Sequence, residues 1–90
     1  MFRVDYLLSV LNDLTAIWTK ADSAARQPIT TASYQIDYQL ERDPENVGES
    51  RPGGRRVLFA LPLGVLYRVD LDKQVVTVID IWLVRPRANP

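Results

Sequence analysis

The chain has 90 residues, and its eleven basic and eleven acidic side chains give a formal net charge of zero at neutral pH. That length suits one domain of modest stability, so we expect a single domain over residues 1–90. Neither cysteine nor histidine is present, which excludes disulfides, His/Cys zinc sites and nucleophilic mechanisms of the Ser-His or Cys-His type. No apolar run reaches the roughly 18–20 residues of a membrane span, and no signal peptide is evident. We therefore predict a cytoplasmic protein that uses no metal or cofactor.

At the N-terminus, residues 2–6 alternate apolar and charged side chains, which predicts a short edge strand. Two amphipathic helices are expected next. In the first, Ser9 is the predicted N-cap, and apolar positions recur at helical spacing, so that Trp18 should pack on the core. In the second, Pro28 is expected in the first turn, and the chain should leave the helix before Pro44.

Three apolar runs over residues 54–85, separated by short turn signals, predict an antiparallel meander, reached through a polar loop at residues 45–54. Side chains alternate between the two faces of a strand. We assign to the core face Val57, Phe59, Leu61, Val65, Tyr67, Val69, Val75, Thr77, Ile79 and Ile81. With the helical hairpin covering this face, the fold class is α+β, in the order β-α-α-β-β-β with a small, mainly antiparallel sheet.

The opposite face of the meander mixes charged and bulky apolar side chains, an arrangement that marks a partner surface. Its candidate partner-binding residues are Leu58, Leu66, Arg68, Val76, Val78 and Trp82. Arg68 and Asp80 share this face on neighbouring strands, and a cross-strand ion pair is favoured over a catalytic role for them.

Basic residues are concentrated in the C-terminal half, where residues 51–90 carry seven Lys/Arg against three Asp/Glu. Five arginines lie at the ends of the predicted meander: Arg51, Arg55, Arg56, Arg85 and Arg87. Guanidinium groups hold phosphate oxygens bidentately and stabilise charge that develops during RNA cleavage. The alternative is ordinary strand-end arginines paired with surface carboxylates. If these arginines do bind phosphate, Arg51, Arg55 and Arg87 are the predicted RNA-binding residues.

The predicted order of elements, together with IDYQLERDPENVGESRPGGRRVLF, PLGVLYRVD and VVTVIDIW, resembles the RelE/ParE family of toxins from type II toxin-antitoxin systems. The resemblance spans nearly the whole chain. It implies a RelE/ParE-like fold, growth inhibition, a role of the kind seen in plasmid stabilisation, and a cognate antitoxin that would bind the partner surface. RelE-like members are mRNA interferases, which cleave mRNA on the ribosome without metal, whereas ParE-like members poison DNA gyrase.

The resemblance also implies catalytic candidates. Arg56 falls on the basic position of the first meander strand, and Arg85 lies close to the basic position after the last strand. Gly64 stands where cleaving members have an arginine, a departure that removes a phosphate ligand and favours a toxin that does not cleave RNA. From the basic positions Arg56 and Arg85 we predict a toxin that acts through ribosome-dependent mRNA cleavage, with a gyrase-binding ParE-like toxin or an inactive protein-binding member as the alternative.

Overall fold

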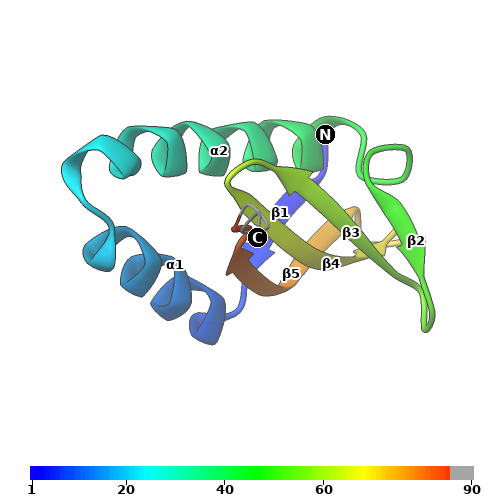
Figure 1. The fold of residues 1–90 in the computed structure, drawn as a ribbon. Coiled ribbons are helices and arrows are strands. Elements are labelled where there is room, and N and C mark those ends of the chain that lie inside the picture. Colours follow the sequence, from blue (N-terminus) through cyan, green and yellow to red (C-terminus); the bar gives the residue numbers. More distant parts are fainter. Residues whose placement is uncertain (86–90) are drawn as a thin grey trace.

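A computed structural model describes residues 1–85, in which two helices pack on one face of a five-stranded sheet (Figure 1). The elements are, in chain order, β1 (Arg3–Tyr6), α1 (Leu8–Lys20), α2 (Ser23–Arg42), β2 (Glu49–Arg51), β3 (Arg55–Ala60), β4 (Leu63–Asp70) and β5 (Val75–Leu83). The spatial order is β1-β5-β4-β3-β2, with β1 parallel to β5 and all other neighbours antiparallel. The predicted α+β fold and meander are confirmed, and β2 is an additional strand within the predicted loop.

Both helices begin earlier than predicted. The carbonyl of Leu7 accepts the first hydrogen bonds of α1, so Ser9 lies inside the helix instead of capping it. In α2, the carboxylate of Asp22 accepts a hydrogen bond of 2.9 Å from the backbone N–H of Ala25, which satisfies a free donor of the first turn. Pro28 therefore falls inside α2. The predicted end of α2, before the next proline, is confirmed.

The core lies between the helices and one face of the sheet. Buried side chains of the two helices meet buried side chains of β3, β4 and β5: Val10, Ile29, Ala32, Ile36, Leu40, Leu58, Ala60, Leu63, Val65, Tyr67, Val76, Val78 and Ile81. We call the sheet face that carries these residues the core face and the opposite one the outer face. The predicted inward positions of Val65 and Tyr67 are confirmed, since both are fully buried.

The predicted core face of β3 is wrong for Phe59 and Leu61, whereas Val57 is buried, although its register partner Leu66 places it on the outer face. Leu58 pairs with Val65 and is buried, whereas Phe59 is 50% exposed and Leu61 71% exposed. Leu58 therefore belongs to the core and is no surface residue. Both alternating sets of this strand are apolar, so alternation did not distinguish the two faces.

In β5, a bulge changes which side chains face the core. Val78 is opposite Tyr67 and Asp80 is opposite Leu66, so Ile79 is an extra residue between two paired ones. Val76 and Val78 are fully buried, which makes their predicted place on the partner surface wrong. Beyond the bulge, the alternation shifts by one residue, and Ile81 faces the core as predicted.

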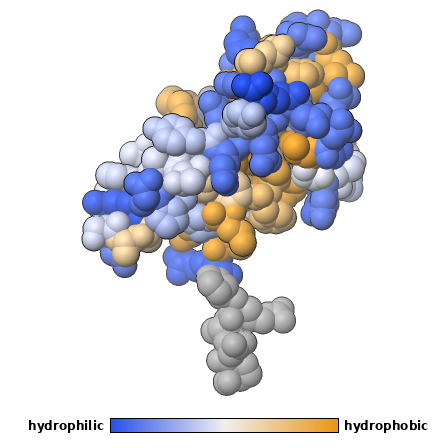
Figure 2. All heavy atoms as spheres, turned by 90° about the horizontal axis from the view of Figure 1, so that it is seen from above, coloured by the Kyte–Doolittle hydropathy of each residue, from blue (hydrophilic) through white to orange (hydrophobic). Residues whose placement is uncertain are grey.

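The surface seen from above α2 is mixed, with separate hydrophobic patches between hydrophilic side chains (Figure 2). The exposed aromatic residues of α2 are Tyr34 and Tyr38, and the guanidinium of Arg42 stacks over the Tyr38 ring. Within residues 1–85, neither helix is long and apolar enough to cross a membrane.

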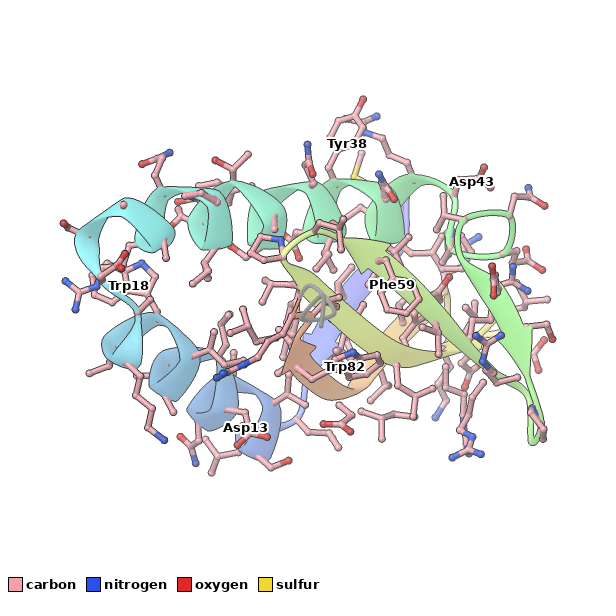
Figure 3. The ribbon with its side chains drawn as sticks, in the orientation of Figure 1. Asp13, Trp18, Tyr38, Asp43, Phe59 and Trp82 are labelled. Atoms are coloured by element: carbon pink, nitrogen blue, oxygen red, sulfur yellow. The ribbon has the colours of Figure 1, made fainter. Side chains whose placement is uncertain are left out.

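Trp18 does not pack on the core, contrary to the prediction. Its side chain lies at the connection between α1 and α2, away from the sheet, and is 43% exposed (Figure 3). The indole N–H donates to the hydroxyl of Thr30 at 3.2 Å, and the guanidinium of Arg26 lies 4.4 Å from the ring centroid. Trp18 therefore joins the two helices at their surface.

Because Trp18 lies at the surface, its removal should destabilise the protein less than removal of a core side chain. Trp18→Ala should lower the free energy of unfolding by about 1–2 kcal/mol, because it removes one hydrogen bond and partly buried apolar area. Ile36→Ala, which empties a fully buried position, should cost about 2–5 kcal/mol. Urea denaturation of both variants measures the difference. Equal losses would contradict the surface position of Trp18.

Candidate functional site

Three arginines lie side by side on the outer face. Arg51 of β2 is the register partner of Arg55 of β3, and Arg55 is the partner of Arg68 of β4. Directly opposite residues on neighbouring strands have Cα atoms about 4.5–5.5 Å apart and point to the same face. We call Arg51, Arg55 and Arg68 the arginine row. The structure thus brings together two of the predicted RNA-binding residues and adds Arg68 to them.

The row is only partly neutralised. Arg51 forms an ion pair of 3.2 Å with Glu49, and Arg55 donates from Nε to the carbonyl of Pro52 at 3.0 Å. Arg68 is exposed, and its side chain forms no hydrogen bond or ion pair within residues 1–85. Like charges directly opposite each other on a sheet are destabilising. An anion placed over the row would remove this repulsion.

The predicted ion pair between Arg68 and Asp80 is not formed in the described part of the chain. Because of the bulge in β5, Asp80 is opposite Leu66, and its carboxylate accepts a hydrogen bond of 2.8 Å from the N–H of Ile81. The neighbouring carboxylate of Asp5 is paired with Arg3 at 3.0 Å. Neither acid neutralises the row.

Arg56, a predicted catalytic residue, faces the opposite way from Arg55. It is the register partner of Tyr67 on the core face, and its guanidinium donates to the carbonyls of Val47 and Gly48 at 3.2 Å. The Tyr67 hydroxyl lies 2.7 Å from the carbonyl oxygen of Pro44 and 2.8 Å from that of Val47. Arg56 and Tyr67 together hold the loop between α2 and β2 against the sheet.

Arg56 and Arg85 do not converge on one point. Arg56 is the register partner of Tyr67 in β4, which in turn is the partner of Val78 in β5. Arg85, in contrast, follows the last residue of β5, Leu83. At about 3.3 Å per residue, the levels of the two arginines are roughly 20 Å apart along the sheet. The predicted catalytic pair therefore cannot contact the same phosphate in this arrangement. Arg87 lies outside the described residues.

An aromatic pair occupies the outer face farther along β3, β4 and β5. Gly64 of β4 is the register partner of both Phe59 and Trp82. A Cβ atom at Gly64 would come within 2.6 Å of the indole of Trp82, so the indole lies on the glycine. Phe59 stands edge-on to it, with ring centroids 6.2 Å apart and an interplanar angle of 81° (Figure 3). An arginine at position 64 would therefore displace Trp82.

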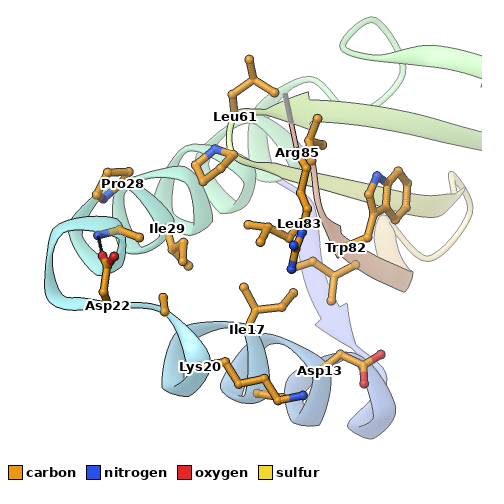
Figure 4. A pocket seen from close by; sticks show the side chains of 16 residues that line it. Asp13, Ile17, Lys20, Asp22, Pro28, Ile29, Leu61, Trp82, Leu83 and Arg85 are labelled. Atoms are coloured by element: carbon orange, nitrogen blue, oxygen red, sulfur yellow. Dashed lines mark hydrogen bonds between the residues drawn. The ribbon is translucent and has the colours of Figure 1, made fainter. Parts of the chain in front are cut away.

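A groove of about 980 Å³ opens between α1, α2 and the end of β5 (Figure 4). The two helices diverge from their connection, and Ile17, Ile29 and Leu83 line the space between them. Arg85 also lines the groove, and Trp82 forms part of its wall. Sequence reasoning missed this groove, because the apolar stripes of the helices were expected to be fully covered by the sheet.

The predicted partner surface is divided by the structure. Leu58, Val76 and Val78 are core residues, whereas Leu66, Arg68 and Trp82 lie on the outer face. Arg68 is exposed, and Leu66 and Trp82 are half-buried.

No protein-family model and no curated protein sequence matches the chain. Solved structures do match it. The chromosomal ParDE toxin-antitoxin system of P. aeruginosa matches with a TM-score of 0.74 and 18% identity, over 94% of this chain and 98% of the other. The RelBE2 toxin-antitoxin complex of Mycobacterium tuberculosis matches with a TM-score of 0.70 and 19% identity, over 91% and 90%. The isolated RelE toxin of E. coli matches with a TM-score of 0.65 and 18% identity, over 97% and 88%.

The chain has the fold of the RelE and ParE toxins. The predicted RelE/ParE-like architecture is therefore confirmed. These matches cover 91–97% of this chain.

Removal of the Tyr67 hydroxyl should loosen the loop that it holds. Tyr67→Phe should lower the free energy of unfolding by about 1–3 kcal/mol, because a buried carbonyl loses its donor. Tyr34→Phe, at a position that is 72% exposed, is the matched control and should change stability by less than about 0.5 kcal/mol. Thermal or urea unfolding measures both. A loss in Tyr67→Phe no larger than in the control would contradict the structural role.

The same hydroxyl predicts a loss of stability at high pH. Burial raises the pKa of Tyr67 above its usual value of 10.0, although the nearby Arg56 opposes part of the rise. The folded state therefore keeps this proton when the unfolded state has lost it, so the stabilisation is complete below pH 10 and falls as the pH rises above it. Tyr67→Phe should show a smaller fall between about pH 9 and 11 in urea denaturation. An identical slope in both proteins would refute the assignment.

Proposed function

We propose that this chain is the toxin of a type II toxin-antitoxin system and that it acts on RNA through the arginine row. The fold supports the first part of the proposal, since it is that of RelE and ParE toxins. The observation that carries the second part is the row itself, three arginines that are register partners on neighbouring strands of the face that no helix covers.

Phosphate oxygens are the ligands that such a row fits best. A guanidinium binds phosphate through two parallel hydrogen bonds, and neighbouring guanidinium groups can bind successive phosphates of one strand. In an mRNA-cleaving mechanism, arginines stabilise the negative charge that develops on the phosphate. We assign this contribution to Arg55 and Arg68 instead of Arg56 and Arg85. Arg56 lies on the core face, where two loop carbonyls hold its guanidinium, and Arg85 is roughly 20 Å away beyond the far end of β5.

A ParE-like toxin that binds DNA gyrase without cleaving RNA is the second candidate. The observation that favours it is the indole of Trp82 over Gly64. It covers the position at which the resemblance to cleaving members calls for a phosphate-binding arginine. The two candidates differ in chemistry, and both agree with the fold.

The antitoxin is proposed to bind in the groove between α1 and α2. Its lining is largely apolar, with charged side chains such as Lys20, Asp22 and Arg85 around it, which suits an amphipathic segment. Trp82 belongs both to the wall of the groove and to the outer face. An antitoxin segment in the groove would therefore reach the edge of the proposed RNA surface.

Expression of the chain without a partner should arrest growth, and Arg68→Gln should relieve the arrest. Arg68 is exposed and free of partners within residues 1–85, so its loss removes charge without disturbing the fold. Arg42→Gln, at the end of α2 on the helical side, is the control and should remain toxic. Normal growth at verified high expression of the unaltered chain would refute the toxin proposal.

Primer extension on transcripts after induction separates the two mechanisms. New 5′ ends within translated mRNA, absent in Arg68→Gln, are the result expected for RNA cleavage. Growth arrest without new 5′ ends, accompanied by DNA breaks that require gyrase, would contradict cleavage and identify the ParE-like mechanism.

The affinity for single-stranded RNA should depend on salt in proportion to the phosphate contacts. Arg68→Gln should reduce the slope of log K against log salt by about 0.7, the value for one phosphate contact on a single strand. Fluorescence anisotropy with a labelled 2′-O-methyl oligoribonucleotide measures this slope. Arg42→Gln serves again as the control, and equal slopes in both variants would contradict binding at the arginine row.

A further inference from the structure

We propose that Trp82, held on Gly64 beside Phe59, is a stacking platform for an unpaired base of the RNA whose phosphates lie on the arginine row. This inference rests on the proposed RNA target and names residues that position the RNA. The platform consists of an indole from β5, a glycine from β4 and a phenyl ring from β3, all at one level of the sheet.

The orientation of the indole follows from three distances. A Cβ built on Gly64 would lie 2.6 Å from Cε2, 2.7 Å from Nε1 and 2.8 Å from Cζ2 of Trp82. Cε2 lies between Nε1 and Cζ2 in the ring and is bonded to both. If the glycine approached the edge of the indole in the plane of the ring, one of these two outer atoms would be nearest, but Cε2 is nearest. A face of the indole therefore covers Gly64, and its other face is directed away from the sheet.

Phe59 completes the platform. Its ring stands nearly perpendicular to the indole, at an interplanar angle of 81°, and remains 50% exposed. A base stacked on the indole of Trp82 would therefore have the ring of Phe59 at its side. Covering a glycine of a strand stabilises the sheet by itself, but that role does not require a second, half-exposed aromatic ring beside the indole.

The arginine row determines what kind of ligand can lie on this platform. Gly64 precedes Arg68 by four residues in β4, and Phe59 follows Arg55 by four residues in β3. The platform and the row are therefore about 13 Å apart on the same face. Proteins that bind single strands combine a basic surface for phosphates with aromatic rings for bases, and the stacking tolerates any base. We therefore expect little sequence preference at this position.

The test compares an intact hexameric 2′-O-methyl oligoribonucleotide with an abasic strand of the same length and charge. In the full chain carrying Trp18→Phe, Trp82 is the remaining tryptophan, so its fluorescence reports the platform alone. The intact strand should quench this fluorescence and bind about 10-fold more tightly than the abasic strand. Trp82→Leu should weaken binding of the intact strand to the abasic level and leave the abasic affinity unchanged.

Two further variants separate stacking from folding. Trp82→Phe keeps an aromatic ring and should retain a preference for the intact strand, whereas Arg68→Gln should weaken both strands equally. A thermal melt of each variant confirms that it is folded. Equal affinity of the unaltered chain for the two strands would overturn the inference, as would a Trp82→Leu variant that loses both to the same extent.

Growth arrest and oligonucleotide binding, measured together, distinguish a failure of the platform from a failure of the toxin proposal. Growth arrest by a chain that binds intact and abasic strands equally would overturn the platform and leave the toxin proposal standing. Absence of both growth arrest and oligonucleotide binding would overturn both. A third outcome is that Trp82→Leu still prefers the intact strand, while its toxicity is no longer neutralised by the product of a neighbouring reading frame. Trp82 would then be an antitoxin contact, and the platform would be overturned.

Discussion

The pairing register of β3, β4 and β5 determines what each face of the sheet contains. Because side chains alternate along a strand, a slip of one residue in β3 would turn Arg56 outward and Arg55 toward the core. The buried side chain of Tyr67 opposes such a slip, since it pairs with Arg56 and its hydroxyl reaches the carbonyls of the loop after α2. The bulge at Ile79 then lets β5 bury Val78 and still present Trp82 on the outer face.

Two consecutive arginines consequently have different roles. Arg56 is held by backbone carbonyls and stabilises a loop, whereas Arg55 stands between Arg51 and Arg68 on the outer face. Like charges on directly opposite residues are destabilising in general, and we interpret the presence of such a row as the consequence of a surface that binds an anion. The neutral charge of the whole chain does not argue against such a surface, because the basic residues of the C-terminal half are brought together by strand pairing.

The sequence predicted the elements and their order well, since the helical and alternating patterns are long enough to be distinctive. It could not predict the faces of β3, where both alternating sets are apolar, or the bulge in β5, which leaves no mark in composition. Arg51 and Arg55 were recognised as phosphate-binding candidates from residue type alone. Their alignment with Arg68 depends on register, and the platform of Trp82 depends on a glycine opposite it, so both required the structure.

We propose above that RNA binds the arginine row on the outer face. An NMR titration with a 2′-O-methyl oligoribonucleotide, observed through the arginine Nε–H signals, tests this binding site because each guanidinium reports separately. We expect shifts of the Nε–H signals of Arg51, Arg55 and Arg68 that saturate together, with the signals of Arg26 and Arg42 on the helices unchanged. Shifts of Arg56 and Arg85 without shifts in the row, or no saturable change at all, would contradict it.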